Sequence, residues 1–210
     1  MLGGGPLGLR ERKKQATRRA LRDAAVRLTL ERGLEKVTVE EIAAEADVST
    51  RTFFNYFGTK EDALLDDLPR GPDEEARREF VDGGPTGDFV EDLITALIRF
   101  LVSTDDLATQ RADMRLRRQL TEREPQLVRG VLARFYEMEA ELAAAVAERT
   151  GASPEDDRPL LIAAAAMSVM RHTMRRLHFS ETEEAAQVRA KVREAFRHLG
   201  EAYGPFASDD

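Results

Sequence analysis

Residues 38–60 read TVEEIAAEADVSTRTFFNYFGTK, and this stretch decides the fold of the N-terminal part of the chain. Thr38 is followed three positions later by Glu41, which is the spacing of a capping box, in which each side chain accepts a hydrogen bond from the other residue's backbone amide. The pattern predicts a helix that begins at about Val39. Apolar residues recur along it at helical spacing, and Asp47 ends it because a short polar side chain tolerates the left-handed backbone of a tight turn.

A second helix follows the turn, with Ser49 as its preferred N-cap. Phe53 and Phe57 lie four positions apart on that helix and face the core together. The side chains left facing outward are those of Thr50, Arg51, Thr52 and Asn55. Two short helices at this spacing, with a polar outer face on the second, form the arrangement that places a helix in the DNA major groove.

The pattern T-x-x-x-I-A-x-x-A-x-V-S-x-x-T-F-F-x-Y-F-x-x-K resembles the DNA-binding domain of the TetR family of transcriptional regulators. Similarity at the level of motifs covers residues 16–65, and beyond them only the length and the helical pattern are similar. Asp47 stands where the family usually has glycine. Phe54 stands where a tyrosine is common, so a phosphate contact through a phenol oxygen is lost at that position, whereas Tyr56 keeps its hydroxyl.

The net charge of −7 is unevenly distributed along the chain. Through residue 60 there are twelve lysines and arginines against eight acids, a net charge of +4, so the remaining residues carry −11. A positive head on a negative body attracts phosphate at one end only, which orients the molecule as it approaches a duplex. The alternative is that the basic runs RERKK and RR are a solvated helix face, an explanation that the neighbouring helix-turn-helix disfavours.

Composition narrows the class of protein. The chain of 210 residues is 42% hydrophobic and 34% charged, which is typical of a soluble helical protein. Its longest apolar stretch, residues 160–167, is far shorter than the roughly 20 residues that cross a bilayer. The N-terminal sequence MLGGGPLGL lacks the basic and apolar regions of a secretion signal, so we expect a cytoplasmic protein. The absence of cysteine excludes disulfides and thiolate metal sites.

The pattern along the chain predicts an all-α protein. The resemblance implies that an N-terminal three-helix helix-turn-helix DNA-binding domain is followed by a C-terminal helical ligand-binding and dimerisation domain. We expect a flexible segment at residues 1–8, the DNA-binding domain at 9–66 and the effector-binding and dimerisation domain at 67–210. Helices are expected at residues 10–32, 39–46, 50–57, 59–68, 74–81, 88–102, 105–121, 125–149, 160–179 and 183–202.

The outward residues of the second short helix are the candidate contacts with DNA. Arg51 can donate two hydrogen bonds to guanine, and Asn55 can bind adenine or a phosphate. Thr50 and Thr52 share the first turn of the helix, where side chains reach base edges. The side chains better placed for phosphate oxygens, which set register without reading sequence, are those of Thr38, Ser49, Tyr56 and Lys60.

A ligand site in the C-terminal part is a weaker inference from the positions of methionines and phenylalanines. These side chains can line an adaptable apolar cavity, although at helical spacing they also serve as ordinary core. The candidate lining residues are Phe89, Phe100, Met114, Phe135, Met138, Met167 and Met170. No cofactor is expected.

Enzymatic motifs are missing from the sequence. There is no glycine-rich phosphate loop, no G-x-S-x-G turn and no thiol nucleophile. His172 and His178 lie six positions apart, nearly opposite on a helix, so they cannot share a metal ion as a pair at i and i+4 does. We therefore expect neither an enzyme nor a metal site.

The last two helices are rich in small residues. Four consecutive alanines in LLIAAAAMSVM allow another helix to approach closely, either in a monomer core or across a dimer. The resemblance implies a homodimer formed through these helices, bound to a palindromic operator in double-stranded DNA as a repressor that a small-molecule effector releases. It also implies that the segment around Pro69 and the helix before it transmits the effector signal.

Two other functions remain open from the sequence. One is an architectural, nucleoid-associated DNA-binding protein without an effector, which a body lacking any enclosed pocket would favour. The other is a ligand-binding or scaffold protein whose helix-turn-helix packs against protein, which a failure to bind any genomic fragment would favour. The identity of the operator and of the effector does not follow from the sequence.

Overall fold

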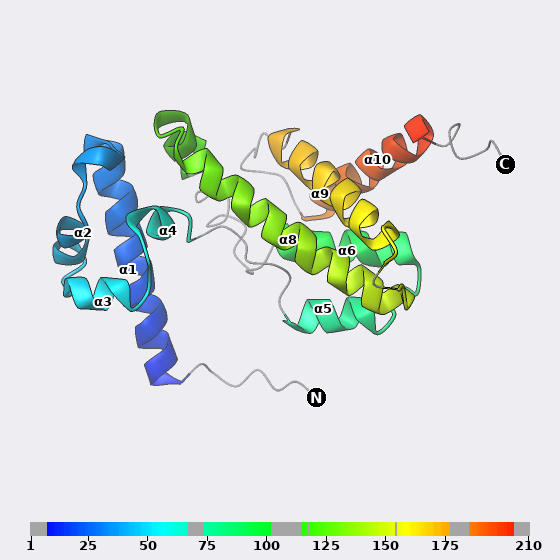
Figure 1. Cartoon of the computed structure of the whole chain (residues 1–210), viewed down its shortest axis with the longest axis horizontal. Helices are drawn as coiled ribbons and strands as arrows, with labels where there is room; N and C mark the ends of the chain where they lie inside the picture. The colour runs from blue at the N-terminus through cyan, green and yellow to red at the C-terminus, as the bar shows by residue number, and fades with distance from the viewer. Residues whose placement is uncertain are drawn as a thin grey trace. The chain divides into compact units, whose positions relative to one another are not determined.

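A computed structural model describes residues 8–66, 74–101, 115–116, 118–153, 155–176 and 185–203. These residues form α-helices joined by turns, and the all-α fold predicted from the sequence is confirmed (Figure 1). The chain divides into two compact units. The first comprises Met1–Leu68 together with Asp113–Leu132, and the second comprises Pro69–Ala112 together with Ala133–Asp210.

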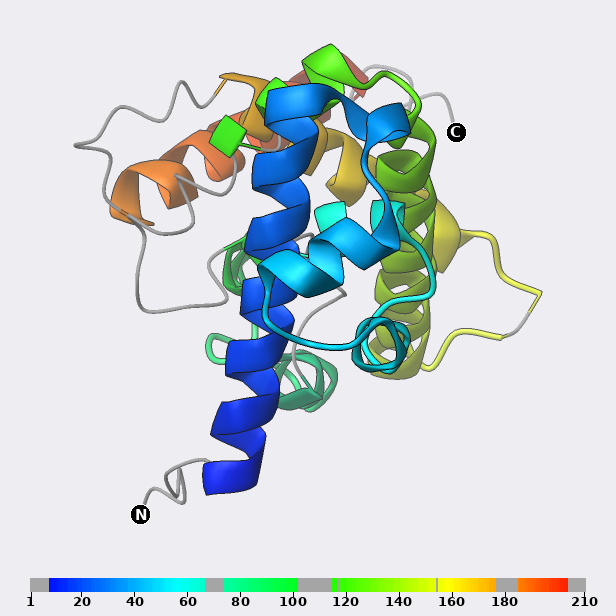
Figure 2. The same ribbon diagram turned by 90° about the vertical axis from the view of Figure 1, so that its left-hand side faces the viewer.

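The helices of the first unit begin close to where the sequence pattern places them, although the third ends at Phe54 and not at residue 57. They are α1 (Leu9–Arg32), the short 3-10 helix η1 (Leu34–Lys36), α2 (Val39–Glu45), α3 (Thr50–Phe54) and α4 (Lys60–Leu64). Figure 2 faces this unit, with α1 as the long blue helix and the short helices beside it. The fourth helix is shorter than expected, because it ends at Leu64 and residues 67–73 lie outside the described residues.

Local capping explains where α2 starts and stops. The Oγ1 of Thr38 accepts a hydrogen bond from the Glu41 amide at 3.2 Å, and the Thr38 amide donates to Glu41 Oε2 at 2.9 Å, which completes the predicted capping box. Asp47 has a φ of 54°, the left-handed backbone expected at the turn. The amide of Val48 then donates to the carbonyl of Ala43 at 2.9 Å and closes the turn.

The next two helices are capped in the same way. The Ser49 hydroxyl accepts from the Thr52 amide at 3.1 Å, as an N-cap does. Thr59 and Asp62 form a second capping box at the start of α4, with hydrogen bonds of 2.9 and 3.0 Å. Each helix start in the helix-turn-helix is therefore fixed by side chains within three residues of it.

One hydrophobic core holds the first unit together. Its buried members come from α1, η1, α2, α3 and α4, and also from a distant part of the chain. They are Leu21, Ala24, Ala25, Val26, Leu28, Leu34, Val37, Ile42, Ala43, Phe53, Phe57, Ala63, Leu64, Leu65, Leu120 and Leu127. The core of the helix-turn-helix is thus completed by residues some 60 positions further along the sequence.

The segment 115–132 belongs to the first unit, whereas the sequence pattern assigned everything after residue 66 to one C-terminal domain. Leu120 and Leu127 are buried in the core of the head, and Glu124 between them bonds to Leu34. Gly130 allows a close approach as well, since a Cβ at this position would lie 2.6 Å from the Cδ1 of Leu65. We refer below to the first unit, this segment included, as the head.

The second unit contains α5 (Glu74–Val81), α6 (Phe89–Leu101), α9 (Arg158–Arg176), α10 (Ala185–Tyr203) and, after Leu132, the rest of α8 (Leu127–Thr150). The expected start of α8 at Pro125 is wrong by two residues, because Pro125 lies in the turn that precedes the helix. Within this unit α10 packs against α6 and α9, and α5 packs against α6.

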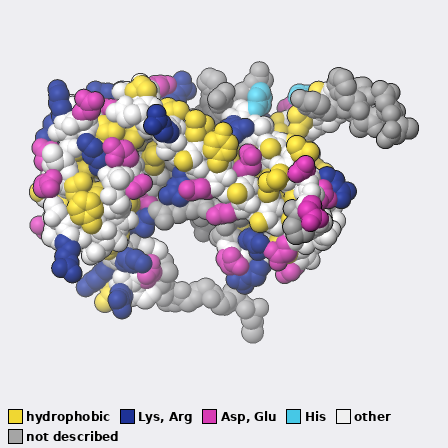
Figure 3. Space-filling view, viewed as in Figure 1, with side chains coloured by type: hydrophobic (Ala, Val, Ile, Leu, Met, Phe, Trp, Pro, Cys, Tyr) yellow, Lys and Arg dark blue, Asp and Glu magenta, His cyan; other side chains and the backbone are white. Residues whose placement is uncertain are grey.

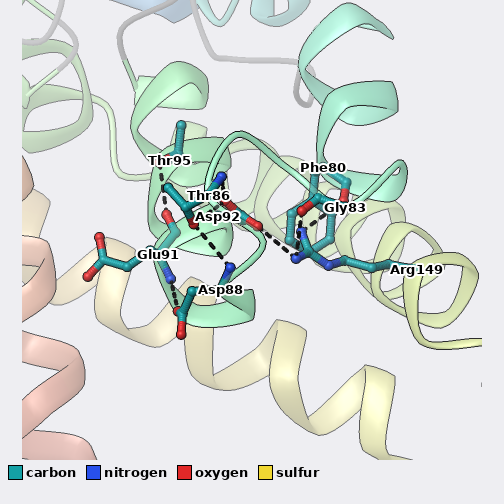
Figure 4. Close-up of polar contacts among 8 residues, drawn as sticks. All are labelled: Phe80, Gly83, Thr86, Asp88, Glu91, Asp92, Thr95 and Arg149. Atoms are coloured by element: carbon teal, nitrogen blue, oxygen red, sulfur yellow. Dashed lines mark hydrogen bonds and ion pairs between the residues drawn. The ribbon is translucent and has the colours of Figure 1, made fainter.

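A buried polar cluster fixes the connection between α5 and α6 (Figure 4). Arg149, near the end of α8, donates to Asp92 Oδ2 at 2.7 Å and to the carbonyl oxygens of Phe80 at 2.9 Å and Gly83 at 3.2 Å. The second oxygen of Asp92 accepts from the amide and the hydroxyl of Thr86 at 2.9 and 2.7 Å. The side chain of Asp92 is fully buried and that of Arg149 is 9% exposed.

Among the described residues, no helix is long and apolar enough to cross a membrane.

Candidate DNA interface

The helix α3 is anchored by two aromatic side chains. Phe53 and Phe57 are buried, with ring centroids 5.6 Å apart, as their spacing predicted. Phe54 points the other way and is 58% exposed, although its ring edge still contacts Phe53 at a centroid distance of 5.5 Å. The helix therefore has a rigid inner face and presents its remaining side chains to solvent.

The predicted base-reading residues lie on the outer side of α3. Arg51 and Asn55 are exposed, and Thr50 and Thr52 are half-buried. Within the part of the chain that the structure describes, no carboxylate pairs with the guanidinium of Arg51, so its five N–H donors face solvent. By contrast, Arg32 of the same unit is already bonded to Glu41 at 2.7 Å.

The sequence showed only that Phe54 stands where a tyrosine is common, and the structure places this side chain on the outer face with Arg51 and Asn55. An exposed phenyl ring on such a helix can contact the methyl group of thymine. The helical period alone could have shown this, because Phe53 and Phe57 define the inner face and Phe54 is one position off it.

The hydroxyls predicted to bind phosphate are partly occupied by capping. Ser49 Oγ accepts from the Thr52 amide and shares a hydrogen bond of 2.8 Å with Thr52 Oγ1, in which either oxygen can donate. One of the two hydroxyl hydrogens is used in that bond, and the other remains for a phosphate oxygen. At Thr38 the hydroxyl oxygen accepts from Glu41, which leaves its own hydrogen for donation.

Tyr56 is half-buried beside Phe57, with ring centroids 6.4 Å apart. The guanidinium of Arg18 covers the Phe57 ring at 5.2 Å, and its Nε donates to Asp66 Oδ2 at 2.7 Å. The hydrogen bond to Asp66 raises the pKa of Arg18. Arg18 therefore joins α1 to the residues after α4 and supports the aromatic anchor beneath Tyr56.

Lys60 has partners that the sequence did not suggest. Its ammonium donates to the carbonyl oxygen of Leu34 at 2.6 Å and to that of Val37 at 2.9 Å. Two of its three hydrogens are therefore used inside the head, and only one remains for a phosphate. The predicted phosphate contact at Lys60 competes with these two bonds.

Basic side chains also cover the start of α1. Arg10, Arg12, Lys13, Lys14 and Arg19 are exposed there. Figure 3 shows lysine and arginine side chains in dark blue around the head, with acidic side chains between them. The start of α1 therefore carries a concentration of exposed positive charge.

The candidate ligand-binding residues of the second unit differ in how deeply they are buried. Met138 on α8 and Met167 and Met170 on α9 are buried, whereas Phe135 is half-buried. Phe89 is half-buried and its ring lies 5.4 Å from the guanidinium carbon of Arg149, which makes it part of the polar cluster. The side chain of Phe100 and all of Met114 lie outside the described residues.

The described residues contain no cluster of three or more His, Asp or Glu side chains that could hold a metal ion. His172 is exposed, and His198 lies 4.0 Å from Glu194 on the surface of α10. The other histidine, His178, falls outside the described part of the chain.

Comparisons with known proteins agree with this architecture. The family model described as bacterial regulatory proteins, tetR family, matches residues 21–66, and the model described as MftR C-terminal domain matches residues 89–204. The HTH-type transcriptional regulator TcmR of Streptomyces glaucescens is 35% identical over 173 residues, which cover 78% of this chain and 74% of that protein.

Among solved structures, a protein of Mesorhizobium loti described as a TetR-family regulator has a similar fold. The TM-score is 0.52 at 20% identity, over 89% of this chain and 96% of that one. This likeness concerns the fold alone, whereas the family models and TcmR match the sequence itself. The chain belongs to the TetR family of transcriptional regulators.

Proposed function

We propose that this protein is a homodimeric repressor that binds a palindromic operator and is released from it by a small-molecule effector. The observation that carries the DNA-binding part is the outer face of α3, where Arg51, Phe54 and Asn55 are exposed above a buried aromatic anchor. The aromatic anchor holds the helix that carries these side chains, and a site built on a rigid element is positioned more precisely than one on a loop.

In this proposal the contacts divide into two classes. Arg51, Asn55 and Phe54 contact base edges in the major groove, with Thr50 and Thr52 beside them. The hydroxyls of Thr38, Ser49 and Tyr56 bind phosphates and set the register of the head on the duplex. Two heads related by a twofold axis then meet half-sites about 34 to 36 Å apart, so the operator is a palindrome.

The regulatory part of the proposal assigns the effector to the second unit. The buried methionines Met138, Met167 and Met170 supply flexible, polarisable side chains that adapt to an apolar ligand. The dimer forms through α9 and α10, the last two helices. An effector that favours a different separation of the two heads lowers the affinity for the operator by about 5- to 150-fold, which is the usual range of coupling.

The first prediction concerns base recognition by Arg51. Arg51→Ala is expected to weaken binding to the selected operator by about 1 to 3 kcal/mol and to relax the preference at one base pair in each half-site. The measurement is a binding-site selection from random DNA, followed by titration of the selected operator and of single-base variants. An unchanged base preference would show that Arg51 does not read a base.

Arg51→Lys is the matched control. Lysine keeps the positive charge but lacks the planar fork that donates two parallel hydrogen bonds to guanine. We therefore expect this variant to keep the salt dependence of the wild type and to lose most of the base preference. If wild-type protein selects no sequence at all from random DNA, the proposed function itself is wrong.

A further inference from the structure

The backbone of Leu34 is held at both ends by charged side chains from distant parts of the head. Its amide donates to Glu124 Oε1 at 2.8 Å, and its carbonyl oxygen accepts from Lys60 Nζ at 2.6 Å. The same ammonium reaches the carbonyl oxygen of Val37 at 2.9 Å. Glu124 and Lys60 are 90 and 26 positions away from Leu34, so these bonds form only in the folded head. We call the three hydrogen bonds from Glu124 and Lys60 to the backbone of Leu34 and Val37 the clasp.

The clasped residues form one turn of 3-10 helix, in which the Val37 amide also donates to the carbonyl oxygen of Leu34, at 3.3 Å. Gly33 has a φ of 85°, which ends α1 and turns the chain into η1. The amide at the start of a helix has no partner within that helix, and Glu124 supplies one for Leu34. Hydrogen bonds to a charged partner are roughly twice as strong as neutral ones, so both contacts hold this short segment firmly.

The segment leads directly into the N-terminal end of α2. Leu34 and Val37 are buried in the core of the head, and Thr38 is the N-cap of α2. The Val37 carbonyl and the Thr38 amide belong to one planar peptide group, so holding the carbonyl also orients the amide that closes the capping box with Glu41. Whatever fixes residues 34–37 therefore also fixes the end of α2 that faces a phosphate in the proposed function.

We propose that Lys60 and Glu124 are positioning residues for this phosphate-binding end of α2. The inference rests on the proposed function and replaces the direct contact between Lys60 and DNA that the sequence predicted. In this assignment Lys60 acts through the carbonyl oxygens of Leu34 and Val37, and Glu124 acts through the Leu34 amide. The two side chains together set where Thr38 meets the DNA backbone.

The location of Lys60 supports this role. It is the first residue of α4, and a positive charge at the N-terminal end of a helix is disfavoured by the helix dipole. Carbonyl oxygens at 2.6 and 2.9 Å offset that cost within the folded head, whether or not DNA is present. A phosphate contact made with the same two hydrogens would require both of these bonds to break.

Glu124 links the clasp to α8. Glu124 lies in sequence between the buried residues Leu120 and Leu127. Its backbone carbonyl oxygen accepts a hydrogen bond from the Leu127 amide at 3.0 Å, in the turn where α8 starts. Beyond Leu132 the same helix continues as part of the second unit. The Glu124 side chain therefore joins the turn before α8 to the Leu34 amide within the head.

The first experiment measures operator affinity against salt concentration for the full-length protein and Lys60→Met. Methionine keeps the length of the side chain and removes the ammonium. We expect binding about tenfold weaker at every salt concentration, the loss that corresponds to about one strong hydrogen bond, with an unchanged salt slope. A slope that falls by about one would return Lys60 to the phosphate contacts and overturn the inference.

Phosphate ethylation interference then locates the effect on the DNA. Thr38→Val identifies the phosphate that Thr38 contacts, since interference at that phosphate disappears when the hydroxyl is removed. Lys60→Met and Glu124→Ala are expected to weaken interference at this same phosphate and to leave the others unchanged. Uniform weakening at all phosphates would indicate a merely destabilised head and would contradict a positioning role.

Conservative and matched variants complete the design. Glu124→Gln keeps an acceptor oxygen for the Leu34 amide and is expected to restore most of the affinity lost in Glu124→Ala. Glu122→Ala is the control, because Glu122 is exposed and bonded to Arg118 of the same turn, 2.8 Å away. The double variant Lys60→Met/Glu124→Ala should weaken operator binding by less than the product of the two single fold-changes, because both side chains act on one segment. If the two losses of binding free energy simply added, the two residues would act separately.

Amide hydrogen exchange tests the clasp without DNA. The Leu34 amide is expected to exchange faster in Glu124→Ala and in Lys60→Met, and at the wild-type rate in the control Lys36→Met, which removes an exposed lysine from the same short helix. An unchanged Leu34 rate in both clasp variants would overturn the inference. Failure of wild-type protein to select any DNA would instead defeat the proposed function, so the two failures are distinguishable.

Discussion

Replacing Arg149 with methionine is expected to lower the free energy of unfolding by about 3 to 5 kcal/mol. The substitution removes the cation from the fully buried side chain of Asp92, and a buried charge without a partner is strongly destabilising. It also removes the bonds to the carbonyl oxygens of Phe80 and Gly83 and the contact between the guanidinium and the rings of Phe80 and Phe89. Urea denaturation of the two proteins, followed by circular dichroism, measures the difference.

The control is Arg134→Met on the same helix. Arg134 pairs with Glu137 at 2.8 Å on the surface of α8, where an ion pair contributes roughly 0 to 1 kcal/mol. The double variant Arg149→Met/Asp92→Leu should recover part of the loss, because it leaves no unpaired charge in the interior. If Arg149→Met were no more destabilising than Arg134→Met, the cluster would not hold the second unit together.

The loss of stability in Arg149→Met is expected to depend on pH. Burial acts to raise the pKa of Asp92, but the hydrogen bonds from Arg149 and Thr86 outweigh it and hold the pKa below its ordinary value of 3.8. A lowered pKa contributes stability that is present above the unfolded value and is lost as the pH falls through the folded value. Arg149→Met keeps the burial and the Thr86 hydrogen bonds but loses Arg149, so we expect a higher pKa for Asp92 than in the wild type and a smaller loss of stability on protonation.

The difference in unfolding free energy between wild type and Arg149→Met is therefore expected to be largest near neutral pH and to shrink as the pH falls from about 5 to about 3. Denaturation curves at several pH values across this range test it. A difference that stayed constant with pH would mean that the loss comes from packing against Phe80 and Phe89 and not from the charge of Asp92.

The local features of the head were predictable from sequence, for a physical reason. The caps at Thr38, Ser49 and Thr59 and the left-handed turn at Asp47 depend on atoms within about four residues, so a short motif specifies them completely. The inner face of α3 follows from helical period in the same way. These local interactions decide that Arg51 and Asn55 face outward from the inner face of α3.

Interactions between distant residues were not predictable in this way. Arg149 and Asp92 are 57 positions apart, and Glu124 and Leu34 are 90 positions apart. In the sequence alone Arg149, Asp92 and Glu124 cannot be told from ordinary surface charges, because the neighbouring residues do not indicate which distant group each will contact in the fold. The same limit explains the domain boundary, since an amphipathic helix pattern does not say which core its apolar face completes.

Leu120→Ala is expected to destabilise the head by about 2 to 5 kcal/mol, the usual cost of removing a buried leucine side chain. Leu120 is 2% exposed and belongs to the core formed by the helix-turn-helix. The loss should appear as faster exchange of the amides of Ile42 and Phe53, which lie in that core, and as weaker operator binding, because α3 loses its rigid support.

Leu132→Ala is the matched control for this variant. Leu132 lies in the same segment of the head but is 45% exposed, so the same substitution creates no cavity there. We expect little change in the exchange of Ile42 and Phe53. If Leu120→Ala instead sped up exchange only at Val146 and Met167, which are buried in the second unit, then residues 115–132 would support that unit and not the head. Loss of protection at Ile42 and Phe53 alone would show that a TetR-family helix-turn-helix here depends on a segment far beyond its own sequence.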